Sequence, residues 1–211
     1  MCFVSVYMKD IIDNAIDLLR KKDLVRENLI KLSRELTRVS RSIIVGVHNG
    51  DDVKELREQA RMMVNEILSL LKDYPDLIDS VRGSLQEYSE AFIFNAILHE
   101  NRLISFTELN VDPASYLLGV SDALGELRRE VIKSVDQWKL EEALKILDWM
   151  KDINNELSKW DLPDAIAPGL RHKVDVNRRL IEDLEVMISE AKRARDLIQS
   201  MSKLLAYFEK R

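Results

Sequence analysis

The sequence predicts an all-α protein built as one bundle of about six to seven long helices. Only six glycines and four prolines occur among its 211 residues, so few positions interrupt a helix. Hydrophobic residues make up 46% of the chain and recur at helical spacings, and no segment alternates in the way of a β-strand. This length is enough to bury a core, and we expect residues 1–211 to form a single domain.

The first helix is expected over residues 5–47, where apolar residues recur along one side. On the opposite side, basic residues follow one another at steps of three and four, namely Lys31, Arg34, Arg38 and Arg41. Such a stripe is usually a solvated face, and Glu27 and Glu35 partly neutralise it. Binding of an RNA backbone by this basic stripe is the less favoured of the two interpretations.

The second helix should start after Asp51 or Asp52, either of which can cap it. It should end before Pro75, because the residue before a proline avoids the helical conformation. Proline suits the first turn of a new helix, so a third helix is expected over residues 75–100. A connector then covers residues 101–111.

Asp112 and Pro113 give the capping and starting signals of the fourth helix, which should extend to Asp136. A fifth helix is expected over residues 139–158, followed by a proline-containing loop over residues 161–169.

A long helical tract then extends to Phe208. A tract of over forty residues is too long for one compact bundle. We therefore expect it either to break or to pack against another subunit.

Two of these helices carry pairs of acidic residues. Glu87 and Glu90 are spaced i,i+3, and Asp122 and Glu126 are spaced i,i+4, so each pair projects from one face of its helix. On adjacent helices the four carboxylates can converge, and a hard divalent cation would offset their repulsion. Oxygen donors without a neighbouring His or Cys suit Mg²⁺ or Mn²⁺. The alternative is that each pair is a solvated polar face.

The surroundings of the first pair favour a buried position, because residues 91–98 are apolar around the whole helix. In the second helix, Gly119 and Gly125 each cost about 1 kcal/mol of helix stability, which is acceptable if another backbone or a ligand approaches closely. Arg129 and Lys133 lie on the same face as the second acid pair. They can either pair with the acids or bind an RNA phosphate.

The segments Leu85-Gln-Glu-Tyr-x-Glu-Ala91 and Tyr116-Leu-Leu-Gly-Val-x-Asp-x-x-Gly-Glu-Leu127 resemble the translin-associated factor X branch of the translin family. The resemblance covers residues 24–189 and implies a translin-like helical fold. It also implies a metal-dependent endoribonuclease in which Glu87, Glu90, Asp122 and Glu126 are the catalytic and metal-binding residues. The chain departs from the eukaryotic pattern in its shorter linker between the motif helices, in Ala96 where the family has a histidine, and in its near absence of an N-terminal extension.

The same resemblance implies single-stranded RNA as the substrate and assembly into an octameric shell, either alone or with a translin-like subunit. The main alternative is a non-catalytic scaffold of the translin type that binds single-stranded nucleic acid. A helical interaction module without any role in RNA binding is the third possibility.

Charge and composition limit the partners further. A net charge of −5 argues against general binding to nucleic acid, so any contact with RNA must be a local patch. No run approaches the ~18 apolar residues of a membrane span. The single cysteine, Cys2, fits a reducing compartment. We therefore expect a cytoplasmic protein with no membrane partner.

Overall fold

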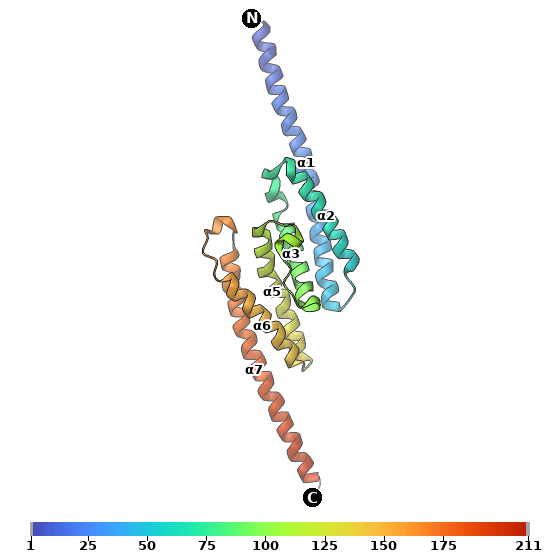
Figure 1. Cartoon of the computed structure of the whole chain (residues 1–211), viewed down its shortest axis with the longest axis vertical. Helices are drawn as coiled ribbons and strands as arrows, with labels where there is room; N and C mark the ends of the chain where they lie inside the picture. The colour runs from blue at the N-terminus through green and yellow to red at the C-terminus, as the bar shows by residue number, and fades with distance from the viewer. Residues whose placement is uncertain (1, 210–211) are drawn as a thin grey trace.

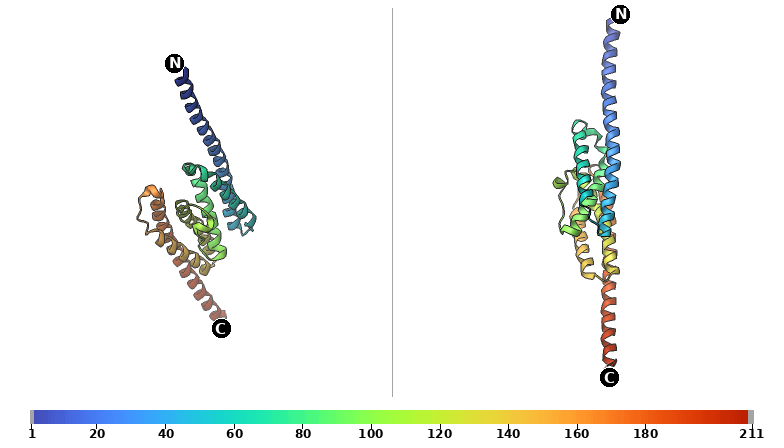
Figure 2. Two further views of the ribbon diagram at one scale, coloured as in Figure 1. Left: turned by 45° about the horizontal axis from the view of Figure 1, so that its top comes forward. Right: turned by 90° about the vertical axis from the view of Figure 1, so that its right-hand side faces the viewer.

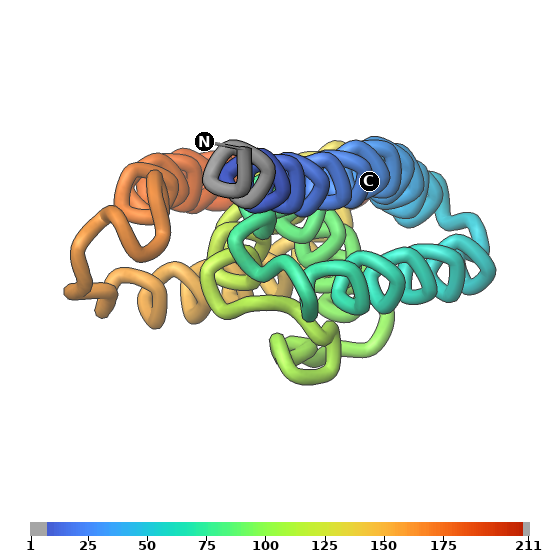
Figure 3. The backbone as a smooth tube through the Cα atoms, turned by 90° about the horizontal axis from the view of Figure 1, so that it is seen from above, coloured from blue at the N-terminus to red at the C-terminus, as the bar shows by residue number. Residues whose placement is uncertain are grey.

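Two long helices dominate the computed structural model, which describes residues 2–209 and the side chains of residues 8–208. Helix α1 (Cys2–Asn49) and helix α7 (Leu170–Glu209) run in the same direction and project from opposite ends of the body (Figures 1 and 2). Seen from above, both lie along one side of the molecule (Figure 3). No strand occurs within residues 2–209, so the all-α prediction is confirmed. The side chain of Cys2 lies outside the described part.

Shorter elements form the rest of the body. They are α2 (Lys54–Asp73), the 3-10 helix η1 (Pro75–Ser80), α3 (Arg82–Asn95), the π-helix η2 (Ala96–Glu100), α4 (Phe106–Leu109), α5 (Pro113–Asp136), α6 (Leu140–Leu157) and the 3-10 helix η3 (Asp164–Ile166). None of the helices within the described residues is both long and apolar enough to cross a membrane.

Two of the predicted helix starts can be compared directly with the structure. Asp112 caps α5 as expected, since its carboxylate accepts hydrogen bonds from the backbone N–H groups of Ala114 and Ser115, each at 3.1 Å. At α2 the cap position is occupied by Val53, not by an aspartate. The Asp52 carboxylate, one residue before this cap position, still accepts a hydrogen bond from the backbone N–H of Lys54 at 2.9 Å. It thereby satisfies one of the N–H groups that have no partner within the first turn of α2.

The prediction of one regular helix over residues 75–100 is wrong. The segment starts as a 3-10 helix, is interrupted at Val81 (φ −126°, ψ −9°) and ends as a π-helix. The connector that follows contains the short helix α4, which was not predicted from the sequence. Helix α4 begins with a capping box, in which the Ser105 side chain accepts the backbone N–H of Glu108 and the Glu108 side chain accepts the backbone N–H of Ser105.

The core is centred on α3 and α5. Every residue from Ala91 to Ile97 is buried, as the apolar run predicts, and the stripe from Tyr116 to Val131 on α5 packs against it. One hydrophobic cluster continues from Leu29 on α1 to Ile188 on α7. The assignment of the whole chain to a single domain stays a prediction.

Helix α7 does not break, so the first of the two outcomes expected for the C-terminal tract is not found. It is continuous over 40 residues, and its last buried apolar residue is Ile188. Arg195 still pairs with Glu141 of α6, whereas every side chain described beyond it is exposed, and the end of the helix projects from the body (Figure 1). Its packing against another subunit stays a prediction.

Candidate active site

The close approach of α3 and α5 depends on Gly119. A β-carbon at this position would lie 2.6 Å from Ser89 Cβ, 2.7 Å from the Gln86 carbonyl oxygen and 2.9 Å from the Glu90 nitrogen. Only glycine therefore allows the backbone of α3 to pass this close to α5. The close backbone approach is found at Gly119, whereas a β-carbon at Gly125 would meet no atom of the described chain within 4 Å.

Glu90 lies at the centre of the acidic residues that this approach brings together. It is half-buried, and among the described side chains it has no hydrogen bond or ion pair. Burial raises the pKa of Glu90 to about 8, and the charges of Asp122, Glu126 and Glu87 add to the effect. The other three carboxylates of the predicted site therefore all lie close enough to Glu90 to act on it electrostatically.

Glu87 is bound by an arginine of the predicted basic stripe. Arg41 donates from Nε and Nη2 to the two carboxylate oxygens of Glu87, each at 3.0 Å. This two-pronged contact joins α1 to α3, and the hydrogen bonds and charge of Glu87 raise the pKa of Arg41. The acid remains partly exposed on the surface of the site.

Asp122 is bound by a cation from the far end of the sequence. Lys173, on α7, donates to one carboxylate oxygen of Asp122, and the side-chain amide of Gln86 donates to the other. The positive charge of Lys173 also partly offsets the rise in the pKa of Glu90. Helix α7 thus supplies the ammonium group that faces two of the four acids.

Glu126 belongs to a network around His48 at the end of α1. The two ring nitrogens of His48 lie 2.6 Å from carboxylate oxygens, Nε2 from Glu126 and Nδ1 from Glu130. A protonated imidazole can donate to both. Arg129 donates to Glu126 at 3.0 Å. Lys133 instead donates to the His48 carbonyl at 2.7 Å, at the C-terminal end of α1.

The donor set suits a hard cation by its chemistry, since all four groups are carboxylates and Glu90 forms no ion pair within the described residues. The side chains do not yet form a ligand cage. Basic groups bind the other three acids, and within the described residues no three His, Cys, Asp or Glu side chains are arranged to hold one ion. A metal ion would therefore have to replace bonds that Arg41, His48 and Lys173 now make.

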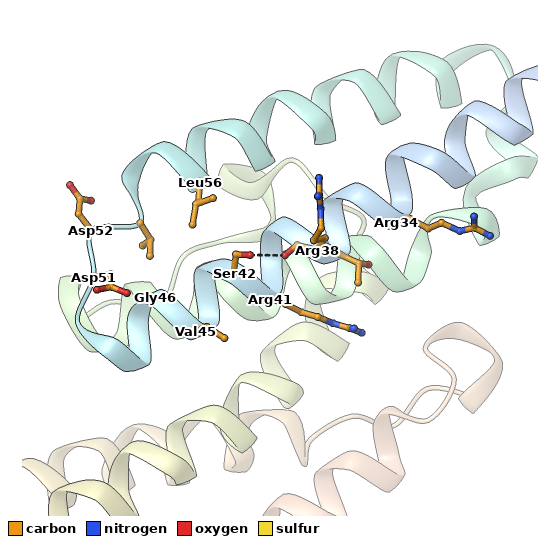
Figure 4. A pocket seen from close by; sticks show the side chains of 11 residues that line it. Arg34, Arg38, Arg41, Ser42, Val45, Gly46, Asp51, Asp52 and Leu56 are labelled. Atoms are coloured by element: carbon orange, nitrogen blue, oxygen red, sulfur yellow. Dashed lines mark hydrogen bonds between the residues drawn. The ribbon is translucent and has the colours of Figure 1, made fainter.

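The remaining residues of the basic stripe lie apart from the acids. Arg34, Arg38 and Arg41 line a cavity of about 690 Å³ between α1 and the start of α2, which Asp51 and Asp52 also line. Figure 4 shows the three arginines leaving α1 in different directions. The stripe, which begins with Lys31, is exposed along α1, but only Arg41 contacts an acid of the site.

Three residues of the site were missed in the sequence, namely His48, Gln86 and Lys173. Gln86 lies directly before Glu87 and could have been found from its position on the helix. His48 and Lys173 lie 78 and 51 residues from the acids that they bind, so no local spacing identifies them.

The comparisons with known proteins agree on one family. The model of the translin family matches residues 24–188. An uncharacterized protein of Methanocaldococcus jannaschii is 33% identical over 85% of this chain and 82% of that protein. The translin-associated protein X homolog of Schizosaccharomyces pombe is 23% identical over 76% of this chain and 78% of that protein. A structure of AfC3PO in complex with duplex RNA has a TM-score of 0.82 and 27% identity, and covers 87% of this chain and 97% of that chain.

Proposed function

Because the chain belongs to the translin family, we propose that it binds RNA and cleaves it as a metal-dependent endoribonuclease. One observation carries the proposal. Glu90 is half-buried, the charges of three other carboxylates act on it, and it forms no hydrogen bond or ion pair within the described part of the chain, so that Lys173 offsets their effect only in part. Burial of an unpaired carboxylate among like charges costs folding free energy if the cluster is purely structural, whereas a bound cation would offset that cost.

Similarity to other proteins supports RNA as the substrate. The AfC3PO structure contains duplex RNA, and the fission yeast relative is a homolog of translin-associated protein X. The substrate that we propose for this chain is single-stranded or flexible RNA. Assembly as a homo-oligomer such as an octameric shell, or with a translin-like subunit, and a cytoplasmic location are further parts of the proposal.

Each acid has a role in the proposed chemistry. Mg²⁺ or Mn²⁺ would be held by Glu87, Glu90, Asp122 and Glu126, and such an ion supplies a more acidic bound water and positive charge for the leaving oxygen. Burial of Glu90 reduces screening of these charges by water. Arg41 is the side chain suited to exchange a carboxylate for an RNA phosphate, because a guanidinium binds either anion through two N–H groups.

The basic stripe and Arg129 are the proposed contacts to the RNA backbone. Lys31, Arg34 and Arg38 continue along α1 from Arg41, and all are exposed. Lys133 is less suited to this role than expected, because it already binds a carbonyl at the end of α1. Each phosphate contact should appear in the salt dependence of RNA binding.

Cleavage of labelled RNA tests the proposal. Purified protein is incubated with a single-stranded RNA or with its duplex, in Mg²⁺ or in EDTA, alongside Glu90→Gln and the exposed control Glu66→Gln on α2. We expect cleavage of the single strand that requires Mg²⁺, is lost in Glu90→Gln and is kept in Glu66→Gln. Products should carry 5′-phosphate and 3′-hydroxyl ends, and a cyclic 2′,3′-phosphate would contradict a metal-bound water.

The second candidate function is a non-catalytic scaffold that binds single-stranded nucleic acid. It is favoured by the cations that bind three of the four acids without any metal, namely Arg41, Arg129 and Lys173. Equal RNA binding in Mg²⁺ and in EDTA, without cleavage, would support the scaffold. Absence of both binding and cleavage would support a helical interaction module instead.

A further inference from the structure

A buried asparagine joins α7 to α5 directly beside the acidic residues. The carboxamide nitrogen of Asn177 donates to the backbone carbonyl and to the hydroxyl of Ser121, each at 2.9 Å. Both residues are almost fully buried, with exposures of 5% and 2%. Ser121 directly precedes Asp122, so the contact holds the turn of α5 that carries this acid.

Asn177 interrupts an otherwise apolar face of α7. The buried side chains described on this helix recur at steps of four and three, and apart from the asparagine all are apolar, namely Leu170, Val174, Ile181, Leu184 and Ile188. A buried amide costs free energy unless its hydrogen bonds are made, so an apolar residue would be the ordinary choice here. Apolar packing has no preferred direction, whereas hydrogen bonds to one residue fix the position of α7 along α5. The asparagine therefore sets the register between the two helices.

Lys173 lies one helical turn before Asn177, on the same side of α7. Its ammonium group donates to Asp122, the residue next to the one that Asn177 holds. Both members of this ion pair are partly exposed. A lysine has a flexible four-carbon stem, and such a pair contributes little unless its two ends are held in place. The hydrogen bonds of Asn177 hold both ends, because they connect α7 and α5 beside the pair.

We propose that Asn177 is a positioning residue, which sets the register of α7 on α5 and so holds Lys173 against Asp122 as a built-in counter-ion. A cation that enters the site has to displace this ammonium group from Asp122. Through Lys173, Asn177 therefore also lowers the affinity of the acids for a cation. This effect on affinity rests on the proposed function, whereas the positioning of Lys173 does not.

The first test needs no metal. Denaturant unfolding in EDTA is measured for the wild type, Lys173→Met, Asp122→Asn and the double variant, which together give the coupling free energy of the ion pair. The same cycle is repeated in chains that also carry Asn177→Leu, where we expect most of the coupling to be lost. Coupling that stays unchanged while all four proteins lose stability equally would give Asn177 a purely structural role and overturn the proposal. Absence of coupling in the wild-type cycle would also overturn it.

Two further variants separate positioning from a general loss of stability. Asn154→Leu removes a buried asparagine of α6 that forms no hydrogen bond with either member of the pair, so it should leave the coupling unchanged. Ser121→Ala removes the hydroxyl acceptor and keeps the carbonyl, so it should lose part of the coupling. This milder variant carries the test if Asn177→Leu does not fold. Full coupling in Ser121→Ala, or an equal loss in Asn154→Leu, would contradict the proposal.

Titration with Mn²⁺ measures the effect on the site. Asn177→Leu should bind Mn²⁺ severalfold more tightly than the wild type. It should have no further effect in a chain that carries Lys173→Met, because the asparagine acts through the lysine. Weaker binding in Asn177→Leu would overturn the inferred effect on affinity, since it would show that Asn177 holds Asp122 in place as a ligand. A wild type that binds no Mn²⁺ would contradict the proposed function, and the coupling in EDTA would still decide whether Asn177 positions Lys173.

Discussion

At the scale of single residues, Glu90 makes stability depend on pH. Its pKa in the folded chain is raised to about 8, from an ordinary value of 4.5. Between these two pH values the unfolded chain releases the proton while the folded chain keeps it, so the free energy of unfolding falls as pH rises. Below this window the carboxyl group is protonated in both states, so it no longer lowers the free energy of unfolding.

We therefore predict that Glu90→Gln stabilises the protein at pH 8 in EDTA, on the order of a few kcal/mol, and has little effect near pH 4. Chemical denaturation at the two pH values measures the difference. The control Glu66→Gln should change the free energy of unfolding by a similarly small amount at both pH values. A Glu90→Gln variant that is less stable than wild type at pH 8 would disprove the assigned cause.

Lys173 supports a second prediction, which concerns metal affinity. Its ammonium group binds Asp122 and faces Glu90, so it competes with any cation for these carboxylates. Lys173→Met should bind Mn²⁺ about tenfold more tightly, which corresponds to about 1.4 kcal/mol. Isothermal titration measures this affinity without RNA or turnover.

The matched control for Lys173 is Lys151→Met. Lys151 forms a comparable pair with Glu185 at 2.6 Å, between α6 and α7 and away from the four acids. Its substitution should leave Mn²⁺ affinity unchanged. Weaker Mn²⁺ binding in Lys173→Met would mean that the lysine positions Asp122 for the metal and does not compete with it.

At the scale of elements, the two glycines of α5 should respond in opposite ways to the same substitution. Gly119→Ala forces α3 away from α5, and overpacking of this kind costs about 1–3 kcal/mol. Gly125→Ala meets no neighbour, so it should stabilise the helix by up to about 1 kcal/mol. Thermal unfolding compares the two, and Mn²⁺ titration should show weaker binding only for Gly119→Ala. Equal stability of both variants would be evidence against the close helix contact.

Most of the elements could be predicted because their signals are local. Asp112 with Pro113 starts α5, and the proline at position 75 ends α2, through contacts within a few residues. The interruption at Val81 and the π-helix after Asn95 have no such signal. They arise where the chain packs into the core, and tertiary packing overrides local preference there.

The candidate site also contains residues that local sequence signals predict and residues that they do not. The four acids could be paired by their spacing on two helices, and Gly119 indicated the close approach. The basic side chains that bind these acids could not be identified from the sequence, because Arg41, His48 and Lys173 come from helices at both ends of the chain. Only the packing of α1 and α7 against the central pair brings these groups together.

At the scale of the whole molecule, the end of α7 should be dispensable for folding but required for assembly. The last buried apolar residue of α7 is Ile188, and the Arg195–Glu141 ion pair beyond it joins exposed groups of the kind that contribute little. A chain ending at Ala191 should therefore keep the thermal unfolding midpoint within a few degrees and lose its self-association. Circular dichroism and light scattering measure the two properties. A large loss of thermal stability would show that the end of α7 supports the fold itself.

Helix α1 is continuous from its projecting end to Asn49, and this continuity has a mechanical consequence. The same rod carries Arg41, which binds Glu87, and His48, which binds Glu126. If a partner bound the outer end of this helix and moved the helix as a unit, Arg41 and His48 would move with it, together with their contacts to Glu87 and Glu126. Binding at that end would then change how readily these two acids could accept a cation.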